Sequence, residues 1–498
     1  MKNNKNVFLL FSFLIAAFSM QAQHYKCGTV HTEEFMERLE ANVKYSNNHL
    51  SRMYETRYVP IAFHLVADSD GNGRIPEETV YKQLCLINQQ YDSLGFVFYR
   101  KEFNYLDNSL VFDHEGNYTS AIIQAKVPGA VNVFLVNNVF EGAGGYYSPF
   151  GDFVAIPKLY FNREDNVPFS HEIGHYFSIA HPHVGWEDAP YTPALYGETV
   201  TIGSIGSQQT GGQVTVELQN GSNCSVAADR ICDTPPDYGF MQSANACSNP
   251  WEGIVKDRNG DLIYSIPDLY MTYNGYGCSI YNWTHGQATA MMADYDNRGN
   301  IEKTNVPDTL LVTQVPALVY PGNFEKVEEY NNILIDWEPV ANAQGYILKV
   351  AGASELVINT TDTEYLATNL LPDASYSYVV YPIHEIGYCL DVEESFLFFT
   401  GTTTSTNDIV GVNAINLYPN PVTQASEVTL ALDLDNDMDL DISVLSADGK
   451  LVIASQSIRA TSGSFIHKLN VTDLNQGIYF VNIKSATGSI LKRILISQ

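Results

Sequence analysis

The most constraining feature of the sequence is a group of three histidines with a glutamate between the first two: His171, Glu172, His175 and His181. Residues four apart lie on one face of an α-helix, so His171 and His175 can point at one metal ion. Glu172 then lies about 100° further round the helix, beside that ion. His181 reaches the same point only if the chain leaves the helix just after Phe177 and folds back. The spacing predicts three histidines and one water around a metal, which is the open arrangement of catalytic zinc.

A fourth protein ligand would close this site and make it structural. His183 is the candidate for that position, but two residues past His181 we expect it to face away from the metal. In an open site, Glu172 can take a proton from water whose pKa the zinc lowers to about 7.

This histidine pattern resembles that of the metzincin metallopeptidases. Their motif usually has glycine where this chain has Ser178, so we expect an unfavourable φ angle there, at a cost of around 1 kcal/mol. Residues 268–273 (DLYMTY) resemble the Met-turn of these enzymes, and residues 229–236 (DRICDTPP) resemble the D-x-x-x-DTP segment of the pappalysin/cytophagalysin family. Residues 284–287 (THGQ) match the helix start of that family. On these motifs the region from about 57 to 298 is identified as a member.

The resemblance implies roles for the matching residues. It makes the three histidines zinc ligands and Glu172 the general base and acid. It places Met271 beneath the metal as the floor of the site. Tyr273 matches a tyrosine that stabilises the tetrahedral oxyanion, and the alternative is an ordinary core aromatic.

The same resemblance implies a calcium-binding loop. Its ligands would be the carboxylate of Asp229 with the carbonyls of Cys232 and Thr234, which are hard oxygen donors suited to calcium. The alternative is a disulfide-held loop in which Asp233 caps a turn.

Cys27 lies at a position that resembles the latency cysteine of the family. A thiolate is an excellent zinc ligand and could take the place of the water until the N-terminal segment is removed. The alternative is an unpaired cysteine without a role.

The N-terminal sequence bears on whether the other cysteines are expected to form disulfides. Lys2 and Lys5 precede an apolar run and a small-residue site near Ala22, which is typical of a secretory signal. Export favours two disulfides among four clustered cysteines, with three pairings open: Cys224, Cys232, Cys247 and Cys278. Cys85 and Cys389 are isolated in the sequence and are predicted to be buried small hydrophobes.

The net charge and the hydropathy pattern restrict the kinds of partner that we expect for this protein. The 27 basic and 56 acidic side chains give a net charge of −29, which would repel a phosphate backbone, so we expect no nucleic-acid partner. No apolar run after the signal approaches the ~20 residues of a membrane helix, so none is expected in the mature protein.

Beyond residue 305 the pattern changes to short alternating strands separated by turns. The first part resembles a fibronectin type III module, with Trp337 and Tyr346 as core aromatics. The last part, from residues 416–421 (NLYPNP) to the C-terminus, closely resembles the C-terminal sorting domain of the type IX secretion system. That resemblance implies a secreted or surface-attached protein and the type IX machinery as a partner.

The sequence therefore predicts a multi-domain chain, with an α+β metzincin-like catalytic domain followed by two β-sandwich domains. The predicted boundaries are a signal peptide at 1–22, a pro-segment at 23–56, a metallopeptidase domain at 57–300, a fibronectin type III-like domain at 308–400, a linker at 401–412 and a sorting domain at 413–498.

The predicted function is zinc-dependent hydrolysis of extracellular proteins or peptides. We expect the substrate to pair along an edge strand near 153–156. Relatives that cleave before arginine carry an aspartate where this chain has Tyr276, and a tyrosine cannot pair bidentately with a guanidinium. The sequence thus predicts a weak or absent arginine preference. The competing hypothesis is a surface adhesin with an inactive peptidase-like head.

Overall fold

A computed structural model describes most of the chain, in two compact units. The described residues are 26–48, 55–164, 167–239, 255–273, 281–330, 332–368, 370–392, 394–402, 409–423, 427–447, 450–486 and 488–497. An N-terminal unit extends to residue 313 and includes residues 383–390, and a C-terminal unit comprises residues 314–382 and 391–498. The predicted signal peptide lies outside the described residues.

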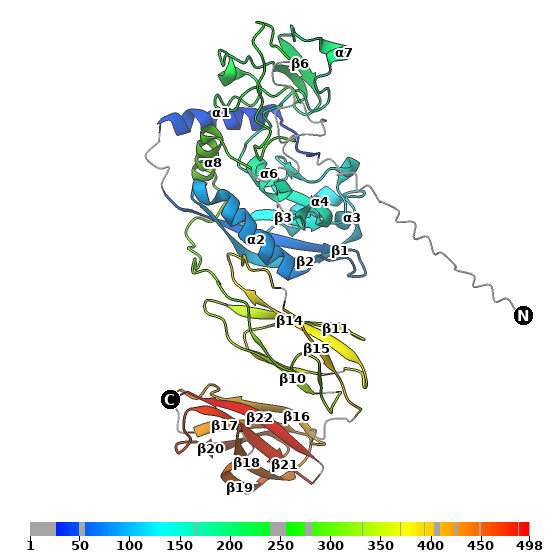
Figure 1. Cartoon of the computed structure of the whole chain (residues 1–498), viewed down its shortest axis with the longest axis vertical. Coiled ribbons are helices and arrows are strands. Elements are labelled where there is room, and N and C mark those ends of the chain that lie inside the picture. Colours follow the sequence, from blue (N-terminus) through cyan, green and yellow to red (C-terminus); the bar gives the residue numbers. More distant parts are fainter. Residues whose placement is uncertain are drawn as a thin grey trace, which may run out of the picture. The chain divides into compact units, whose positions relative to one another are not determined.

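A five-stranded sheet, in the order β2-β1-β3-β5-β4, forms the centre of the N-terminal unit (Figure 1). Its strands are β1 (Arg57–Ala67), β2 (Phe96–Asp107), β3 (Val131–Val136), β4 (Tyr146–Ser148) and β5 (Phe153–Pro157). The first four strands of that order pair in parallel, whereas β4 pairs antiparallel to β5. β1, β3 and β5 are almost wholly buried, as their continuous apolar sequences require.

A strand forms near residues 153–156 as predicted, but the prediction that it is an edge strand is wrong. β5 lies between β3 and β4, so β4 is the edge to which an extended segment can be added. Three residues, two of them buried, are too short a signal to be recognised as a strand.

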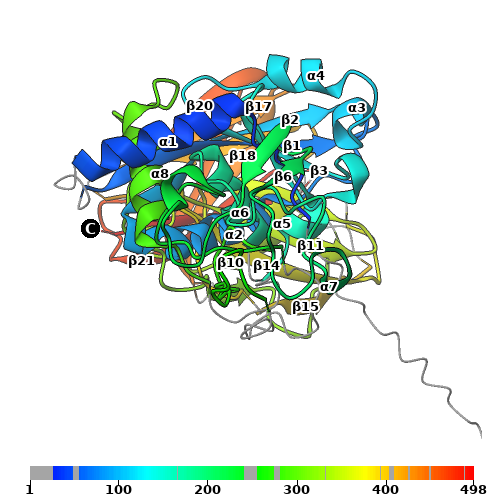
Figure 2. The same cartoon turned by 90° about the horizontal axis from the view of Figure 1, so that it is seen from above.

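Four longer helices pack in this unit: α1 (Glu33–Asn48), α2 (Glu77–Tyr91), α6 (Val167–Tyr176) and α8 (His285–Asn297). Thr32 caps the N-terminus of α1, because its Oγ1 accepts a hydrogen bond from the amide of Phe35. α1 lies alongside α8 in both views (Figures 1 and 2). The shorter elements are η2 (Asp92–Leu94), α3 (Ser109–Phe112), α4 (Tyr118–Ala125), η3 (Phe140–Gly142), α5 (Lys158–Phe161), α7 (Pro193–Tyr196), β6 (Ser204–Ser207), β7 (Gly212–Thr215) and η4 (Cys224–Val226).

The prediction that Cys85 and Cys389 are isolated hydrophobes is wrong. They form a disulfide that joins α2 to the segment 383–390, across a sequence separation of 304 residues. That segment also bonds to its neighbours directly: Asn88 donates to the carbonyl of Ile386 at 3.1 Å. Gly387 has a φ of +81° and lies so close to the backbone of α2 that a Cβ there would overlap it. The segment is therefore part of the N-terminal unit despite its position in the sequence.

The C-terminal unit contains two β-structures, each with its own core. In the first, sheets β13-β10-β8 and β12-β11-β14-β15-β9 enclose a cluster that includes Trp337 and Tyr346, whose ring centroids are 5.6 Å apart. Its strands are β8 (Leu318–Tyr320), β9 (Glu325–Lys326), β10 (Ile333–Trp337), β11 (Gly345–Gly352), β12 (Leu356–Thr360), β13 (Glu364–Ala367), β14 (Ser375–Ile383) and β15 (Phe396–Phe399).

The second β-structure consists of sheets β16-β17-β20 and β19-β18-β21-β22, around a separate aliphatic cluster. Its strands are β16 (Val412–Tyr418), β17 (Glu427–Leu434), β18 (Met438–Ser446), β19 (Leu451–Ala460), β20 (Gly463–Asn470), β21 (Gly477–Lys484) and β22 (Ser489–Ile496). Buried and exposed positions alternate along β17 and β21, as in strands with one face on a core.

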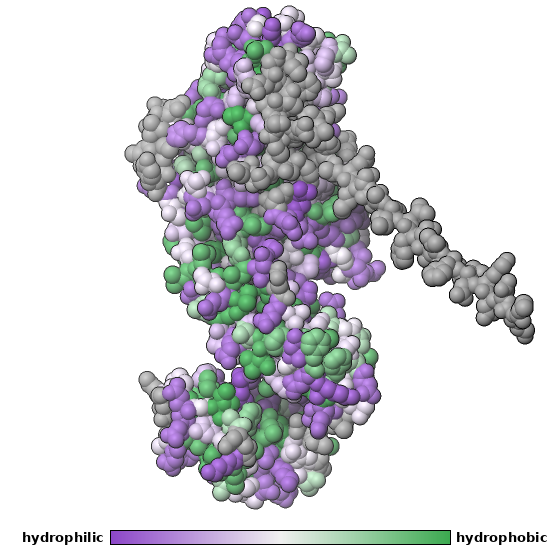
Figure 3. Space-filling view, viewed as in Figure 1, coloured by the Kyte–Doolittle hydropathy of each residue, from purple (hydrophilic) through white to green (hydrophobic). Residues whose placement is uncertain are grey.

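The surface is of mixed polarity. On the face drawn in Figure 3, hydrophilic and hydrophobic residues are interspersed. Within the described residues, no helix combines the length and the apolar character needed to cross a membrane.

Candidate functional site

The helix α6 carries the first part of the site and is buried on every side. Pro168 is its second residue, where a missing N–H is tolerated. Gly174 faces Met271, and a Cβ at this glycine would lie 2.5 Å from the methionine Sδ. A larger residue at this position would require the Met271 side chain to shift, so glycine favours close packing of the segment around Met271 against this helix.

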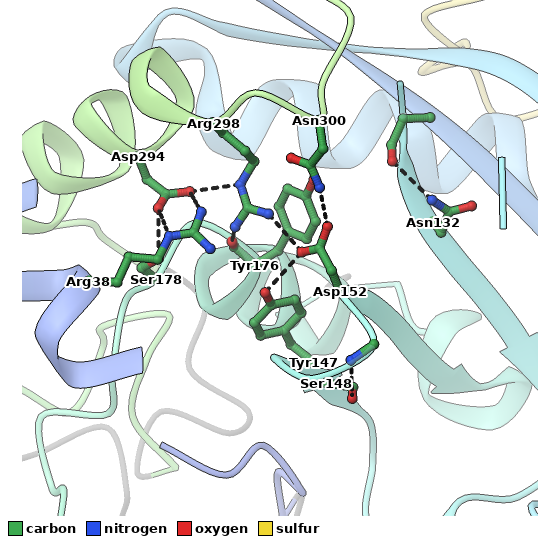
Figure 4. Close-up of polar contacts among 12 residues, drawn as sticks. Arg38, Asn132, Tyr147, Ser148, Asp152, Tyr176, Ser178, Asp294, Arg298 and Asn300 are labelled. Carbon is green, nitrogen blue, oxygen red and sulfur yellow. Dashed lines mark hydrogen bonds and ion pairs between the residues drawn. The ribbon is translucent and has the colours of Figure 1, made fainter. Parts of the chain in front are cut away.

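The chain leaves the helix at Tyr176 and reverses at Ser178, whose φ is +65°. The predicted left-handed conformation of this non-glycine residue is thus confirmed. The Ser178 hydroxyl donates a hydrogen bond of 2.7 Å to Asp294 on α8, and Arg298 donates to the same carboxylate and to the carbonyl of Tyr176 (Figure 4). The reversal that leads to His181 is therefore held by side chains from another helix.

The three predicted histidines converge on one point. The Nε2 atoms of His171, His175 and His181 lie 3.0–3.1 Å from one another, and all three side chains are fully buried. Two ligand nitrogens on a tetrahedral zinc with bonds of 2.0–2.1 Å would be about 3.3 Å apart. The three nitrogens are therefore close enough together to bind one metal ion.

The opposite ring nitrogens fix the tautomers. Nδ1 of His171 donates to the carbonyl of Tyr270 at 2.6 Å, and Nδ1 of His175 donates to the carbonyl of Ile179 at 2.7 Å. With the proton held on Nδ1, each Nε2 keeps its lone pair for a metal. Burial also lowers the pKa of His171 to about 3, which favours the neutral, metal-binding form. The residues present fit a divalent metal with imidazole ligands.

Cys27 joins the histidine group from the N-terminal segment. Its Sγ belongs to a set of ligand atoms, with those of the three histidines, that all lie within 4.8 Å of one another. The thiol is buried and forms no disulfide. Gly28 donates to the carbonyl of Gly145 at 2.9 Å, so the segment is bound beside the edge strand β4. Without a cation, burial and the charge of Glu172 raise the pKa of this thiol, and a divalent ion would favour the thiolate.

Glu172 lies next to the histidine group and is fully buried. One carboxylate oxygen accepts a hydrogen bond from the hydroxyl of Thr29 at 3.0 Å. The same hydroxyl oxygen accepts from the backbone amide of Tyr147 at 2.8 Å. A residue two positions after Cys27 thus contacts the predicted general base, a contact that no local sequence pattern indicates.

Tyr273 is also brought to the site. Its hydroxyl donates to the carbonyl of Cys27 and accepts from the amide of the same residue, both at 3.2 Å. Its ring lies 4.8 Å from that of His181, centroid to centroid. Burial raises the pKa of Tyr273, so the hydroxyl keeps its proton and can act as a donor. His183 stacks on His181 and does not join the group of ligand atoms.

The predicted calcium loop forms a compact turn. The buried Asp229 carboxylate accepts from the Ile231 amide at 3.0 Å and from the Thr234 hydroxyl at 2.8 Å. Cys232 forms a disulfide with Cys224, and the other two candidate cysteines, Cys247 and Cys278, lie outside the described residues. Asp233 accepts from the Gly286 amide at 2.7 Å and so caps the first turn of α8.

A second buried carboxylate near this loop, Glu217, was missed by sequence reasoning. Burial and the charge of Asp229 raise the pKa of Glu217, and burial raises that of Asp229. Neither residue forms an ion pair with lysine or arginine among the described residues. Glu217 follows β7 in a segment of mixed polarity, and its local sequence carries no sign of what it will face.

Comparison with known proteins gives a firm result for the C-terminus. Residues 416–497 match the model of the family described as the secretion system C-terminal sorting domain. These residues form a type IX sorting domain. The protein is therefore exported, and is either secreted or attached to the cell surface. The sorting domain also implies an interaction with the type IX secretion machinery.

Tyr276, on which the specificity prediction rests, lies outside the described residues.

Other comparisons identify similar chains at low identity. No curated protein matches the sequence. A promirolysin mutant from Tannerella forsythia is 14% identical with a TM-score of 0.33, covering 55% of this chain and 95% of that one. The FN1–FN3 domains of chicken CNTN1 are 12% identical with a TM-score of 0.17, covering 38% and 69%. Dimeric latent PorU from Porphyromonas gingivalis is 14% identical with a TM-score of 0.21, covering 37% and 20%. At these scores the likenesses carry no argument about activity.

Proposed function

We propose that the N-terminal unit is a zinc-dependent endopeptidase of the metzincin type, in the pappalysin/cytophagalysin family. The observation that carries the proposal is the convergence of three Nε2 atoms from His171, His175 and His181 beside a buried glutamate. The substrates would be extracellular proteins or peptides, since the chain is exported.

Each group has a part in peptide hydrolysis. A zinc ion held by the histidines would supply Lewis acidity, which acidifies water and polarises a peptide carbonyl. Glu172 would take a proton from the water and deliver it to the leaving amine. Tyr273 would donate a hydrogen bond to the oxyanion that develops on the substrate. The substrate would pair with β4, where residues 26–28 are bound in this structure.

The chain would be made as an inactive precursor. Cys27 would bind the metal in place of the catalytic water and Thr29 would cap Glu172, so the N-terminal segment blocks both the metal and the base. Cys27→Ala should give activity without removal of the segment. If this variant stays as inactive as the wild-type precursor, the latency role of Cys27 is wrong.

A calcium ion at the loop of Asp229, Cys232 and Thr234 is a further part of the proposal. The buried carboxylate of Glu217 would be an additional ligand or would balance its charge. Calcium should raise the melting temperature of the wild type, and Glu217→Gln should reduce that increase. An equal increase in both proteins would exclude Glu217 from the site.

A fluorescence-based casein cleavage assay tests the main proposal. The protein is produced as the full chain, and its N-terminal segment is removed by proteolysis before the assay. We compare the wild type, Glu172→Ala and a control, Glu198→Ala, which changes an exposed glutamate. Activity in the wild type and the control alone supports the mechanism. If Glu172→Ala is equally active, Glu172 is not the base. If all three bind zinc and none cleaves casein or a peptide library, the adhesin hypothesis is favoured.

The peptide library also tests the specificity prediction made from Tyr276. If the cleaved peptides carry mostly arginine at P1′, that prediction is wrong.

A further inference from the structure

Glu187 is a buried carboxylate that the proposed mechanism does not use. One of its oxygens accepts a hydrogen bond from the Gly185 amide at 2.7 Å. The other lies 3.3 Å from Nδ1 of His181 and 3.6 Å from Nδ1 of His31. Among the described residues, no lysine or arginine forms an ion pair with it. A charged carboxylate in such a place is costly unless something nearby favours its charge.

The three histidines of the site are not held in the same way. His171 and His175 are fixed by the helix α6, and their Nδ1 atoms donate to backbone carbonyls. His181 follows the reversal at Ser178 and has no helix to orient it. It is also the one of the three whose Nδ1 faces a carboxylate. The ligand with the least backbone support therefore has the charged partner.

Glu187 itself is rigidly placed. The Val184 amide donates to the carbonyl of His181 at 3.1 Å. This hydrogen bond closes a tight turn between His181 and Val184, just before Glu187. Gly185 has a φ of +95°, and a Cβ there would lie 2.9 Å from the side chain of Ile205. Trp186 is 2% exposed and stacks on another aromatic ring. The carboxylate is thus fixed by packing on both sides of the turn.

We propose that Glu187 is a positioning residue, which holds the Nδ1 proton of His181 and thereby aims its Nε2 at the point shared with His171 and His175. This inference rests on the proposed function, because it assumes a metal at that point. A carboxylate partner fixes the tautomer of a metal-binding histidine and raises its basicity, and losing such a partner typically costs 10–100-fold in metal affinity. In return, a divalent ion on Nε2 strengthens the Nδ1–H donor and favours the buried charge of Glu187.

His31 provides a competing explanation for the same contacts. Its ring is buried against that of His181, with the centroids 4.6 Å apart, and neither of its nitrogens has a hydrogen-bond partner among the residues that the structure describes. His31, His181 and Glu187 could together hold a second ion. In that case Nδ1 of His181 would be a ligand and not a donor. The two explanations predict different metal stoichiometries.

Zinc affinity of the full chain, measured by competition with a chromophoric chelator, tests the proposal. We compare the wild type with Glu187→Ala, Glu187→Gln and a control, Asp257→Asn. Asp257 is also a fully buried carboxylate, but its hydrogen bonds go to the backbone amides of its own turn and of Gln219. The melting temperature of each metal-free protein and the visible spectrum of its cobalt form are recorded in parallel.

We expect Glu187→Ala to lower zinc affinity by 10–100-fold and to change the cobalt spectrum. Glu187→Gln should lose less, because its amide oxygen can still accept from Nδ1, and Asp257→Asn should bind zinc like the wild type. Equal affinities and spectra for folded Glu187→Ala and the wild type would overturn the proposal. So would two zinc ions per wild-type chain with the second lost in His31→Ala. If the wild type binds neither zinc nor cobalt, the proposed function itself fails.

Discussion

The hydroxyl of Ser178 lies 2.7 Å from a carboxylate oxygen of Asp294, and it donates a hydrogen bond across the site from the turn to α8. Asp294 is nearly fully buried and also receives Arg298 at 2.9 Å. The bond gives a reason for serine at a position whose φ of +65° would suit glycine better. A side chain that anchors the turn offsets the strain of the backbone.

We therefore expect Ser178→Ala to lower the free energy of unfolding more than Ser178→Gly does. Alanine loses the bond to a charged acceptor and keeps the strain, so we expect a loss of roughly 1–3 kcal/mol in the free energy of unfolding. Glycine loses the same bond but relieves about 1 kcal/mol of strain, so it should be the less destabilised of the two. Urea unfolding of the metal-free proteins measures both. A more stable alanine variant would contradict this account of the turn.

Arg38 attaches the N-terminal helix α1 to the same carboxylate. Its Nε and Nη2 donate to the two oxygens of Asp294 at 2.6 and 2.8 Å, in the bidentate geometry that makes such pairs strong (Figure 4). Because Arg38 is partly exposed, we expect a moderate effect: Arg38→Ala should lower the hydrogen-exchange protection of α1 by roughly tenfold, or about 1.4 kcal/mol.

A charge removed elsewhere on α1 controls for the helix itself. Lys44 pairs with Glu40 on the exposed face of α1, and Lys44→Ala should leave the protection almost unchanged. Equal protection in the Arg38→Ala and Lys44→Ala variants would show that the contact with Asp294 does not hold the helix.

His64 should make the N-terminal unit sensitive to acid. It is stacked on Phe134 and donates Nε2–H to Asn132 at 2.9 Å, while Asn104 donates to its Nδ1 at 3.0 Å. Burial, only partly offset by the bond to Asn132, lowers its pKa to about 4 from an ordinary 6.5. As the pH falls, His64 is therefore protonated in the unfolded chain before it is protonated in the folded one. The free energy of unfolding decreases between pH 6.5 and pH 4, by up to about 3 kcal/mol.

His64→Gln should flatten this part of the pH profile of the N-terminal unit, measured by urea unfolding in the presence of a chelator. His467 lies in the sorting domain, so His467→Gln should leave the same transition unchanged. An equally steep loss in His64→Gln would assign the acid sensitivity to other groups.

The sequence was most informative where structure depends on local spacing. Helix periodicity predicted that His171 and His175 share a face, and the helix start expected at residues 284–287 is where α8 begins, with a capping box at Thr284. The strands at the centre of the sheet are continuous apolar runs, which is the local pattern of fully buried strands. In each case the signal lies within a short stretch of sequence.

Contacts between distant segments could not be predicted in this way. Glu187 and His31 are 156 positions apart in the printed numbering, and nothing in either local sequence indicates that they meet. The cysteines show the same limit: Cys224 and Cys232 were expected to pair within their cluster, whereas Cys85 was assigned to a core because its partner is 304 residues away. Pairing at that distance depends on the tertiary fold, which single-sequence patterns do not encode.

The Cys85–Cys389 disulfide should accordingly contribute more to stability than the Cys224–Cys232 disulfide. In the loop-entropy model, a cross-link over 304 residues stabilises by roughly 5–6 kcal/mol and one over 8 residues by roughly 2–3 kcal/mol. We expect Cys85→Ala with Cys389→Ala to lower the melting temperature of the N-terminal unit more than Cys224→Ala with Cys232→Ala. The first pair should also increase hydrogen exchange in residues 384–390, which the disulfide holds against α2. A larger effect of the short-range pair, or unchanged exchange in that segment, would mean that the hydrogen bonds and packing of the segment suffice to hold it in place.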